Sequence, residues 1–335
     1  MSPLEVHGEF RPIAALRNPH LQSLLASIKL RRPLVMRRAA GLLAASEEVI
    51  LDCGDGVRLM GEYTAAAGGS SRGLMVLIHG WEGSSSSLYI LSSAARLHTA
   101  GYDIFRLNLR DHGGTHHLNR ELFHSCRLDE TVGAVQAIAE RWPGRPLYLA
   151  GFSLGGNFAL RIARRAPAVG LPLERVVAVC PVLDPARAMA QLEEGWIGYR
   201  LYFLRKWRRS LLIKQACFPD LYDFGNLREL PTLTATTDYF VRRYTEFPDA
   251  ESYLDGYSIT GDVLAGLQVP SRIITAVDDP VIPARDLPRL ARSDALEVLV
   301  TPAGGHCGFV ADWRLESWID TAILAAVTGD RAASR

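Results

Sequence analysis

A serine between closely spaced glycines is the feature that most constrains how this chain can fold. The apolar segment 146–150 runs directly into Gly151-Phe152-Ser153-Leu154-Gly155, and a helical pattern follows at once. A strand that turns this sharply into a helix strains its turn residue, and only small residues two positions to either side avoid a clash. The sequence therefore predicts that Ser153 stands clear of the sheet at the start of a helix, where its hydroxyl can act as a nucleophile.

The histidine that would activate this serine is identified by its position in the chain. A serine on such a turn is followed first by an acid and then by a histidine. Of the nine histidines, only His306 lies after Ser153. It sits in the glycine-rich segment 301–309, directly after the apolar run 295–300. We interpret these glycines as flexibility for an imidazole that moves between nucleophile and leaving group. A solvent-exposed loop histidine is the alternative.

The acid is expected on the loop after the preceding strand. The β-branched segment 271–277 predicts that strand, and it ends in Asp278 and Asp279. Neighbouring residues face opposite ways, so only one of the two carboxylates can reach His306. The spacing to the following prolines, Pro280 and Pro283, favours Asp279, and Asp278 is the alternative. Asp279 would fix the imidazole tautomer and stabilise the imidazolium.

Two backbone N–H groups are predicted to form the oxyanion hole. One is the N–H of Leu154, the residue after the nucleophile. The other is expected on the loop after the apolar strand 73–78, where the N–H of Trp81 is favoured over that of Gly80. His79, at the start of this loop, is assigned a structural role. Loss of one such donor lowers turnover by about 10²–10³.

These motifs, together with an N-terminal N-P-H-L-Q segment at 18–22, resemble a known group of proteins. The group is the part of the α/β-hydrolase superfamily that includes bacterial YheT-type hydrolases, plant EMB8-like esterases, fungal ethyl-ester-forming acyltransferases and animal ABHD-type phospholipases. The resemblance covers essentially the whole chain, with a departure in the loop 106–117. It implies an α/β-hydrolase fold, a mostly parallel doubly wound sheet with a helical cap insertion.

The expected elements leave room for one large insertion. Further strands are expected at 46–52, 57–64, 102–108 and 175–180, and helices near 12–28, 86–100, 127–141 and 154–166. The segment 185–269 is much longer than one crossover helix needs. We therefore predict a core of residues 1–184 and 270–335, and a helical cap of residues 185–269 that lies over the nucleophile.

The predicted cap contains a basic stretch. Residues 195–219 hold six Lys or Arg side chains and no acid, interleaved with aromatic and aliphatic residues. A basic amphipathic helix can lie on an anionic membrane, so peripheral membrane contact through segment 200–214 is one expectation. The alternative, favoured by the sequence alone, is a helix with an apolar underside over the acyl pocket and a solvated basic face.

Composition argues against several other classes. The formal net charge of +1 does not suit a nucleic-acid-binding protein. Five cysteines without paired spacing, no signal peptide and no long apolar run predict a cytoplasmic protein. We expect no cofactor and no metal, although one loop contains possible ligands without regular spacing: Asp111, His112, His116, His117 and His124.

The residues together predict acyl transfer from a carboxylic ester. Ser153 would attack the acyl carbon, His306 would take and return the proton, and Asp279 would support His306. Short- to medium-chain esters or acyl lipids are the expected substrates. Two alternatives remain open: acyl transfer to an alcohol through the same acyl-enzyme, and a catalytically idle scaffold or binding protein.

Overall fold

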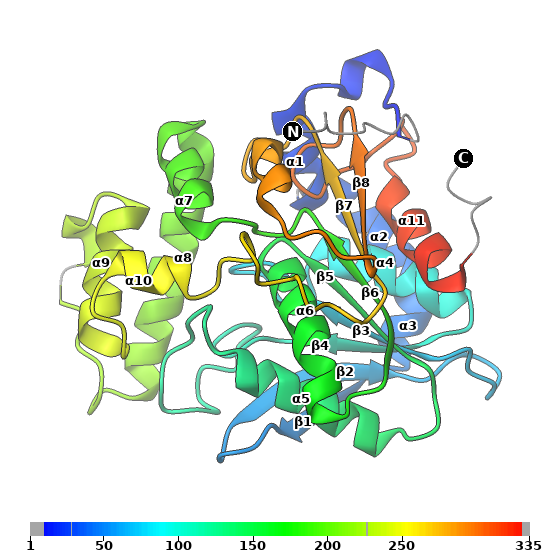
Figure 1. Ribbon diagram of the computed structural model, residues 1–335, viewed down its shortest axis with the longest axis horizontal. Coiled ribbons are helices and arrows are strands. Elements are labelled where there is room, and N and C mark those ends of the chain that lie inside the picture. Colours follow the sequence, from blue (N-terminus) through cyan, green and yellow to red (C-terminus); the bar gives the residue numbers. More distant parts are fainter. Residues whose placement is uncertain (1–9, 28, 226, 330–335) are drawn as a thin grey trace.

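The computed structural model describes residues 10–27, 29–225 and 227–329. Its centre is an eight-stranded sheet with the strand order β1-β2-β4-β3-β5-β6-β7-β8 (Figure 1). β2 is antiparallel to both of its neighbours, β1 and β4, and all other neighbouring strands are parallel. The strands are β1 (Glu47–Asp52), β2 (Arg58–Thr64), β3 (Leu74–Ile78), β4 (Asp103–Leu107), β5 (Leu147–Phe152), β6 (Leu173–Val179), β7 (Ser271–Ala276) and β8 (Leu296–Thr301). The predicted mostly parallel sheet of an α/β-hydrolase fold is confirmed.

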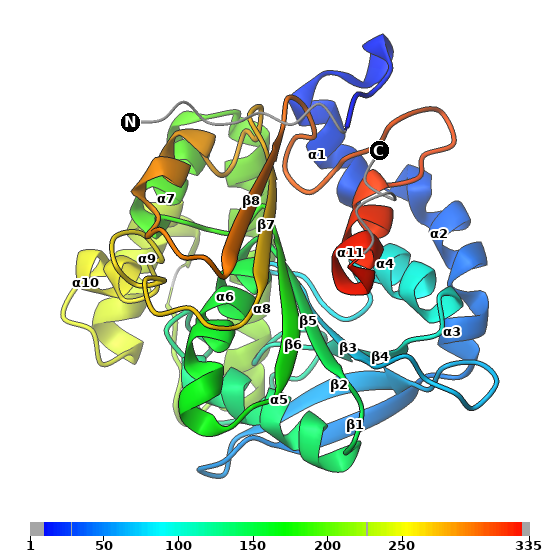
Figure 2. The same ribbon diagram turned by 45° about the vertical axis from the view of Figure 1, so that its right-hand side comes forward.

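Helices cover both faces of this sheet (Figure 2). The α-helices are α1 (Pro19–Ser27), α2 (Arg32–Arg38), α3 (Ala40–Ala44), α4 (Leu88–Thr99), α5 (Leu128–Arg141), α6 (Leu154–Arg165), α7 (Pro185–Glu194), α8 (Ile197–Cys217), α9 (Leu233–Tyr244), α10 (Ala250–Asp255) and α11 (Trp318–Thr328). The described residues also contain five 3₁₀ turns, at Ala14–Leu16, Lys29–Arg31, Ala166–Val169, Leu227–Glu229 and Ala284–Arg289. α5 and α6 lie on one face of the sheet, and α2, α3, α4 and α11 lie on the other.

The central strands are apolar on both faces because helices cover both. Every residue of β3 is buried. Val76 and Ile78 pack into the cluster that contains residues of α5 and α6, whereas Met75 and Leu77 pack into the cluster that contains residues of α4 and α11. Successive strand residues point to opposite faces, so a continuous apolar run is what a doubly covered strand requires.

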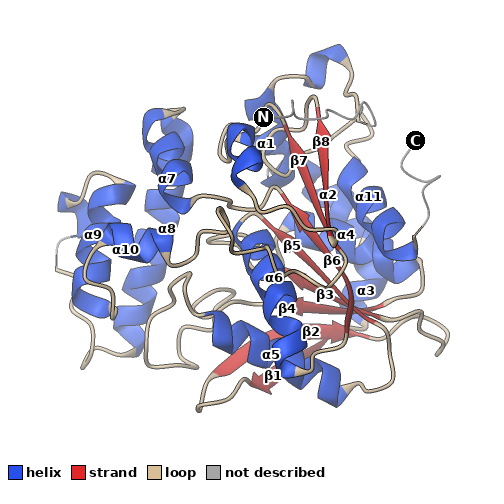
Figure 3. Cartoon of the chain, viewed as in Figure 1, coloured by secondary structure: helices blue, strands red, loops and turns tan. Residues whose placement is uncertain are grey.

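Four helices stand between β6 and β7 in the chain. α7, α8, α9 and α10 gather beside the sheet rather than on either of its faces (Figures 1 and 3). They fall within segment 185–269, and the chain returns from them into β7.

The N-terminal part has more helices than the sequence indicated. One helix was expected near 12–28, but the structure has a 3₁₀ turn at Ala14–Leu16 and then α1. α2 and α3 follow, and Pro33 lies in the first turn of α2, where the missing N–H of proline costs nothing. Val35 and Leu42 of these two helices are buried in the same cluster as α4 and α11.

Candidate active site

The turn between β5 and α6 shows why the glycines around Ser153 are needed. Ser153 has a φ of 53°, in the left-handed region that non-glycine residues rarely adopt. A Cβ atom on Gly151 would lie 2.0 Å from the carbonyl oxygen of Gly155, and one on Gly155 would lie 2.4 Å from that of Ile78. Side chains at these positions would therefore push the strand and the helix apart. The hydroxyl of Ser153 is left at the end of β5 and the start of α6.

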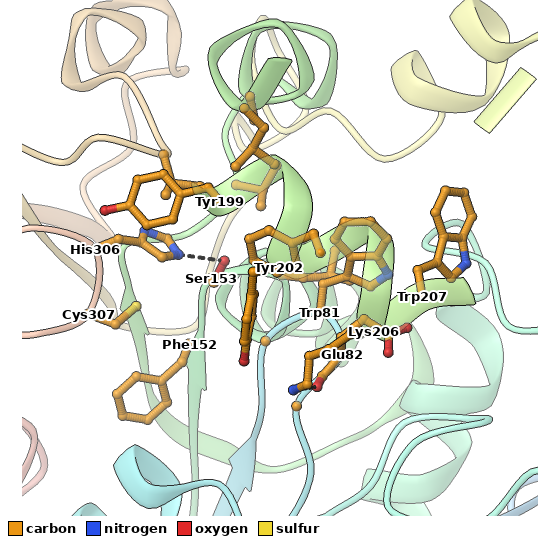
Figure 4. Close-up of a pocket in the computed structure, with 18 of the residues that line it drawn as sticks. Trp81, Glu82, Phe152, Ser153, Tyr199, Tyr202, Lys206, Trp207, His306 and Cys307 are labelled. Atoms are coloured by element: carbon orange, nitrogen blue, oxygen red, sulfur yellow. Dashed lines mark hydrogen bonds between the residues drawn. The ribbon is translucent and has the colours of Figure 1, made fainter. Parts of the chain in front are cut away.

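Ser153, His306 and Asp279 form one chain of hydrogen bonds. The distance from Ser153 Oγ to His306 Nε2 is 3.0 Å, and Figure 4 marks this hydrogen bond. The distance from His306 Nδ1 to Asp279 Oδ2 is 2.9 Å. A carboxylate only accepts, so Nδ1 carries the proton and Nε2 is free to accept from the serine hydroxyl. The structure therefore brings these three predicted residues together in the order that proton transfer from the serine requires.

The two neighbouring aspartates have different partners. The second oxygen of Asp279, Oδ1, accepts from the N–H groups of Val281 (2.8 Å) and Ile282 (2.9 Å), which fixes the carboxylate toward His306. Asp278 Oδ1 accepts from the N–H of Gly305 at 2.9 Å. His306 is thus bonded to Asp279, while Asp278 holds the backbone just before the histidine.

The charge of Asp279 raises the pKa of His306. Burial lowers the pKa of His306, but the negative charge and hydrogen bond of Asp279 outweigh burial, and the pKa is raised above its usual value. The same interaction would stabilise the imidazolium that forms when the serine proton is taken.

The loop of His306 rests on the N-terminal helix α1. The N–H of His306 donates to Ser23 Oγ at 2.8 Å. Gln22 is fully buried: its Nε2 donates to the carbonyls of Leu16 (2.7 Å) and Val310 (2.8 Å), and its Oε1 accepts from the N–H of Val310 (2.8 Å). Sequence reasoning missed these two residues, although the N-P-H-L-Q segment that includes Gln22 drew attention to this helix.

The glycines beside His306 are close-contact positions. A Cβ atom on Gly305 would lie 2.4 Å from the carbonyl oxygen of Pro19, and one on Gly308 would lie 2.2 Å from that of Gln22. The interpretation of these two glycines as flexibility was wrong, because both are needed for the loop to approach the backbone of α1.

The predicted oxyanion loop leaves one of its amides free. The N–H of Gly80 donates to the hydroxyl of Tyr89 (3.0 Å), that of Glu82 to His112 Nε2 (3.1 Å), and that of Gly83 to the carbonyl of Gly80 (2.9 Å). Within residues 10–27, 29–225 and 227–329, the N–H of Trp81 has no acceptor, and neither has that of Leu154.

Two buried histidines hold this loop. His79 Nδ1 donates to the carbonyl of Gly80 (2.7 Å), and its Nε2 accepts from the N–H of Leu109 (3.1 Å). His112 Nδ1 donates to the carbonyl of Arg110 (2.7 Å), so its Nε2 is unprotonated where it meets Glu82. Burial lowers the pKa of His79 to about 4 and that of His112 well below its usual value, so both are neutral. Nothing in the sequence distinguished His112 as a support of this loop.

A cavity of about 690 Å³ opens above Ser153. His306 and Cys307 stand on one side of the serine, and Trp81 and Lys206 on the other (Figure 4). The indole of Trp81 stacks on Phe203 of α8 with ring centres 5.2 Å apart, and residues of α7, α9 and α10 complete the walls. The wall is therefore largely apolar and aromatic, as the walls of small-molecule pockets usually are.

Glu82 and Lys206 add polar groups to this wall. Lys206 Nζ donates to the backbone carbonyl of Glu82 at 2.6 Å, and both residues line the cavity. Burial raises the pKa of the Glu82 carboxyl to about 7. α8 therefore contacts the loop of Trp81 both by ring stacking and by a hydrogen bond.

One cation of the basic stretch is not on a solvated face. Lys214 is fully buried, and its Nζ donates to Asp111 Oδ1 at 2.8 Å and to three backbone carbonyls. The favoured expectation for segment 200–214 was therefore wrong at Lys214, because its charge is matched by an acid from a distant loop. Arg205 and Arg209 of the same helix are exposed.

Among the described residues, one group of side chains has metal-ligand atoms within 4.8 Å of one another: Cys180, His306 and Cys307. An ion here would have to draw His306 away from Ser153 or Asp279, and burial raises the pKa of Cys180 well above its usual value. The donor set therefore does not suit a resident metal that acts together with Ser153. In the part of the chain that the structure describes, no helix has the length and apolarity to cross a membrane.

Known structures share this architecture. 2,6-Dihydroxy-pseudo-oxynicotine hydrolase superposes with a TM-score of 0.57 at 15% identity, over 95% of this chain and 81% of its own. An esterase of Pyrococcus furiosus gives 0.53 at 15% identity, covering 85% and 91%, and a carboxylesterase of Bacillus subtilis gives 0.51 at 16% identity, covering 90% and 98%. A search of curated protein sequences gives no match. At these identities the structural likeness shows a common fold.

The sequence also matches a protein-family description directly. Residues 73–312 match the family described as "alpha/beta hydrolase fold", and this range runs from the strand before Trp81 to beyond His306. The match covers more than half of the chain and agrees with the strand order of the sheet. This chain belongs to the α/β-hydrolase fold family.

Proposed function

We propose that this protein hydrolyses carboxylic esters, with Ser153 as nucleophile, His306 as general base and acid, and Asp279 as the supporting carboxylate. The observation that carries the proposal is the chain of two hydrogen bonds, 3.0 and 2.9 Å long, from the serine hydroxyl through the imidazole to the carboxylate. The chain ends in a largely apolar cavity that can receive an acyl group. The names of two solved structures with the same fold, an esterase and a carboxylesterase, agree with this assignment.

The reaction has two steps. Ser153 Oγ bonds to the acyl carbon as its proton passes to His306 Nε2, and the ester C–O bond breaks as the proton passes to the leaving alcohol. Water then attacks the acyl-serine, again giving a proton to His306, and the acid leaves as Ser153 recovers its proton. In both steps the N–H groups of Trp81 and Leu154 would stabilise the oxyanion. This assignment is supported by the hydrogen bonds of the loop: the N–H groups of Trp81 and Leu154 have no acceptor among the described residues, whereas the N–H of Gly80 is already bonded to Tyr89.

Residues 185–269 are proposed to act as a cap. Side chains of α7, α8, α9 and α10 line the cavity, so this segment would limit the length and shape of the acyl chain. The cavity of about 690 Å³ suits short- to medium-chain acyl groups. The N-P-H-L-Q segment under the histidine loop supports assignment to the YheT, EMB8 and ABHD branch of the family.

The test is hydrolysis of p-nitrophenyl esters from acetate to palmitate. We expect an optimum at short or medium chain length that Ser153→Ala abolishes. Ser258→Ala is a matched control, because Ser258 lies outside the cavity wall and bonds a backbone carbonyl and Thr260. Added ethanol separates hydrolysis from acyl transfer, since a transferase would form the ethyl ester. Turnover that survives Ser153→Ala would refute the proposal.

A further inference from the structure

Large apolar side chains are exposed on two segments that also line the cavity. Six of the thirteen such side chains among the described residues belong to two short segments, and Leu30 is 66% and Leu201 57% exposed. We call these six the entrance rim: Leu24, Leu30, Trp196, Ile197, Leu201 and Tyr202. Leu24, Trp196 and Tyr202 also line the cavity, so they stand where it meets the solvent.

The rim is one surface, although its two segments are far apart in the chain. Nδ1 of His20 in α1 lies 3.1 Å from the hydroxyl of Tyr199 in α8. The imidazole of His20 also contacts the indole of Trp196, with ring centres 5.6 Å apart. These contacts join α1 to the start of α8 beside the opening of the cavity.

α8 has an apolar outer side that packing within this chain does not explain. Its buried residues include Tyr199, Leu204 and Leu211, which face the protein. Ile197 and Leu201, one turn apart, face the solvent instead. An ordinary cap helix would be polar on that side, so the exposed apolar residues indicate a surface that is covered by something else.

Exposed arginines near the rim favour an anionic occupant, and they outnumber the exposed acid Glu194 that precedes Trp196. Arg205 and Arg209 continue the four-residue spacing of Ile197 and Leu201 on the solvent side of α8. Arg32 lines the cavity beside the other half of the rim and is also exposed. Among the described residues, none of these three arginines forms an ion pair. Apolar side chains next to unpaired guanidinium groups fit the boundary between lipid chains and anionic headgroups.

We infer that the entrance rim docks on a lipid surface that carries anionic headgroups, with the cavity opening onto it. Ile197, Leu201 and Leu30 would enter the acyl region while Arg205 and Arg209 pair with headgroups. This inference rests on the proposed function in one respect, because docking of this kind would deliver an acyl lipid directly to Ser153. Docking itself needs no turnover and is measured separately from it.

The test is co-sedimentation of Ser153→Ala protein with vesicles of phosphatidylcholine alone or mixed with phosphatidylglycerol. We expect binding to the mixed vesicles that weakens as salt increases, and little binding to phosphatidylcholine alone. Replacing Ile197 and Leu201 by serine should weaken binding about tenfold or more, and replacing Arg205 and Arg209 by glutamine should remove the preference for phosphatidylglycerol. Unchanged thermal unfolding would show that these variants fold.

Matched controls come from exposed apolar residues elsewhere on the surface. Ile50→Ser and Val263→Ser remove exposed apolar side chains outside the rim and should leave vesicle binding unchanged. Failure of the Ser153→Ala protein to bind mixed vesicles would overturn the inference, as would equal binding by the Ile197 and Leu201 variant. A dimer in light scattering that this variant abolishes would overturn it too, since the rim would then be covered by a second copy. Ester hydrolysis could be absent while docking persists, so the two proposals fail separately.

Discussion

Replacing Gln22 by alanine tests whether α1 supports the histidine loop. Gln22 is fully buried and joins α1 to the segment after His306 through three hydrogen bonds. The truncation leaves the carbonyl of Leu16 and both the carbonyl and the N–H of Val310 without partners. These groups lie in the interior, where an unsatisfied donor or acceptor is costly.

The size of the effect follows from that count. Each unsatisfied buried group costs about 1–3 kcal/mol, so three groups at the lower end cost about 3 kcal/mol. With an unfolding entropy of about 2.1 cal/mol/K per residue, each kcal/mol lowers the melting temperature of this 335-residue chain by about 1.4 °C, which gives a fall of about 4 °C. Turnover should fall as well, because a displacement of about 1 Å at a catalytic group can cost about 10² in rate.

The assay is thermal unfolding followed by circular dichroism, with ester hydrolysis measured on the same samples. Gln136→Ala is the matched control, because Gln136 is half-buried and makes one bond, 3.3 Å long, to the carbonyl of Val169. We expect the control to stay within about 1 kcal/mol of the parent protein. A fall in melting temperature of less than about 2 °C for Gln22→Ala would refute the argument that its three hydrogen bonds hold α1 against the segment after His306.

Three further outcomes are expected. Asp279→Asn should lower kcat by about 10³–10⁴, since it disturbs the tautomer of His306, whereas Asp278→Asn should cost much less; the reverse order would move the acid by one residue. Because Asp279 raises the pKa of His306, the ascending limb of kcat/KM against pH should move to lower pH in Asp279→Asn, and an unshifted limb would contradict this. Lys214→Met should destabilise the fold by about 3–5 kcal/mol, seen as a lower urea midpoint, because it leaves Asp111 buried without its cation; a loss below about 1 kcal/mol would count against it.

The parts of the site that local rules govern were accessible from the sequence. The turn at Ser153 is set by contacts between residues four positions apart, such as Gly151 and Gly155, so its glycine spacing is readable in the chain itself. The positions of β3, β5 and β7 in the chain follow from apolar runs and the turns that end them. Even the pairing of His306 with Asp279 rather than Asp278 depends on a local turn, in which the acid accepts from two N–H groups just after it.

Contacts between distant residues that no motif marks were not accessible. Gln22 and Val310 are separated by 288 positions, and Lys214 and Asp111 by 103, and no periodicity relates such pairs. A run of basic residues in the sequence predicts a solvated helix face. The acid that pairs with the buried Lys214 lies in another loop, so the sequence around Lys214 does not reveal it. In the same way, nothing in the sequence around Gln22 indicates that its side chain bonds two carbonyls and one N–H in the interior.

The glycines around His306 show how a correct assignment can rest on an incorrect reason. Glycine permits both mobility and close approach, and a sequence does not say which is used. At Gly305 and Gly308 the neighbouring atoms decide it, since a methyl group on either would overlap the backbone of α1. The loop is therefore pressed against a helix, with Ser23 holding the N–H of His306 and Asp279 holding its ring. The imidazole must accept a proton from Ser153 across 3.0 Å, and a small displacement from this position would lower the rate of the reaction. Fixing the loop against α1 therefore favours catalysis more than mobility of the imidazole would.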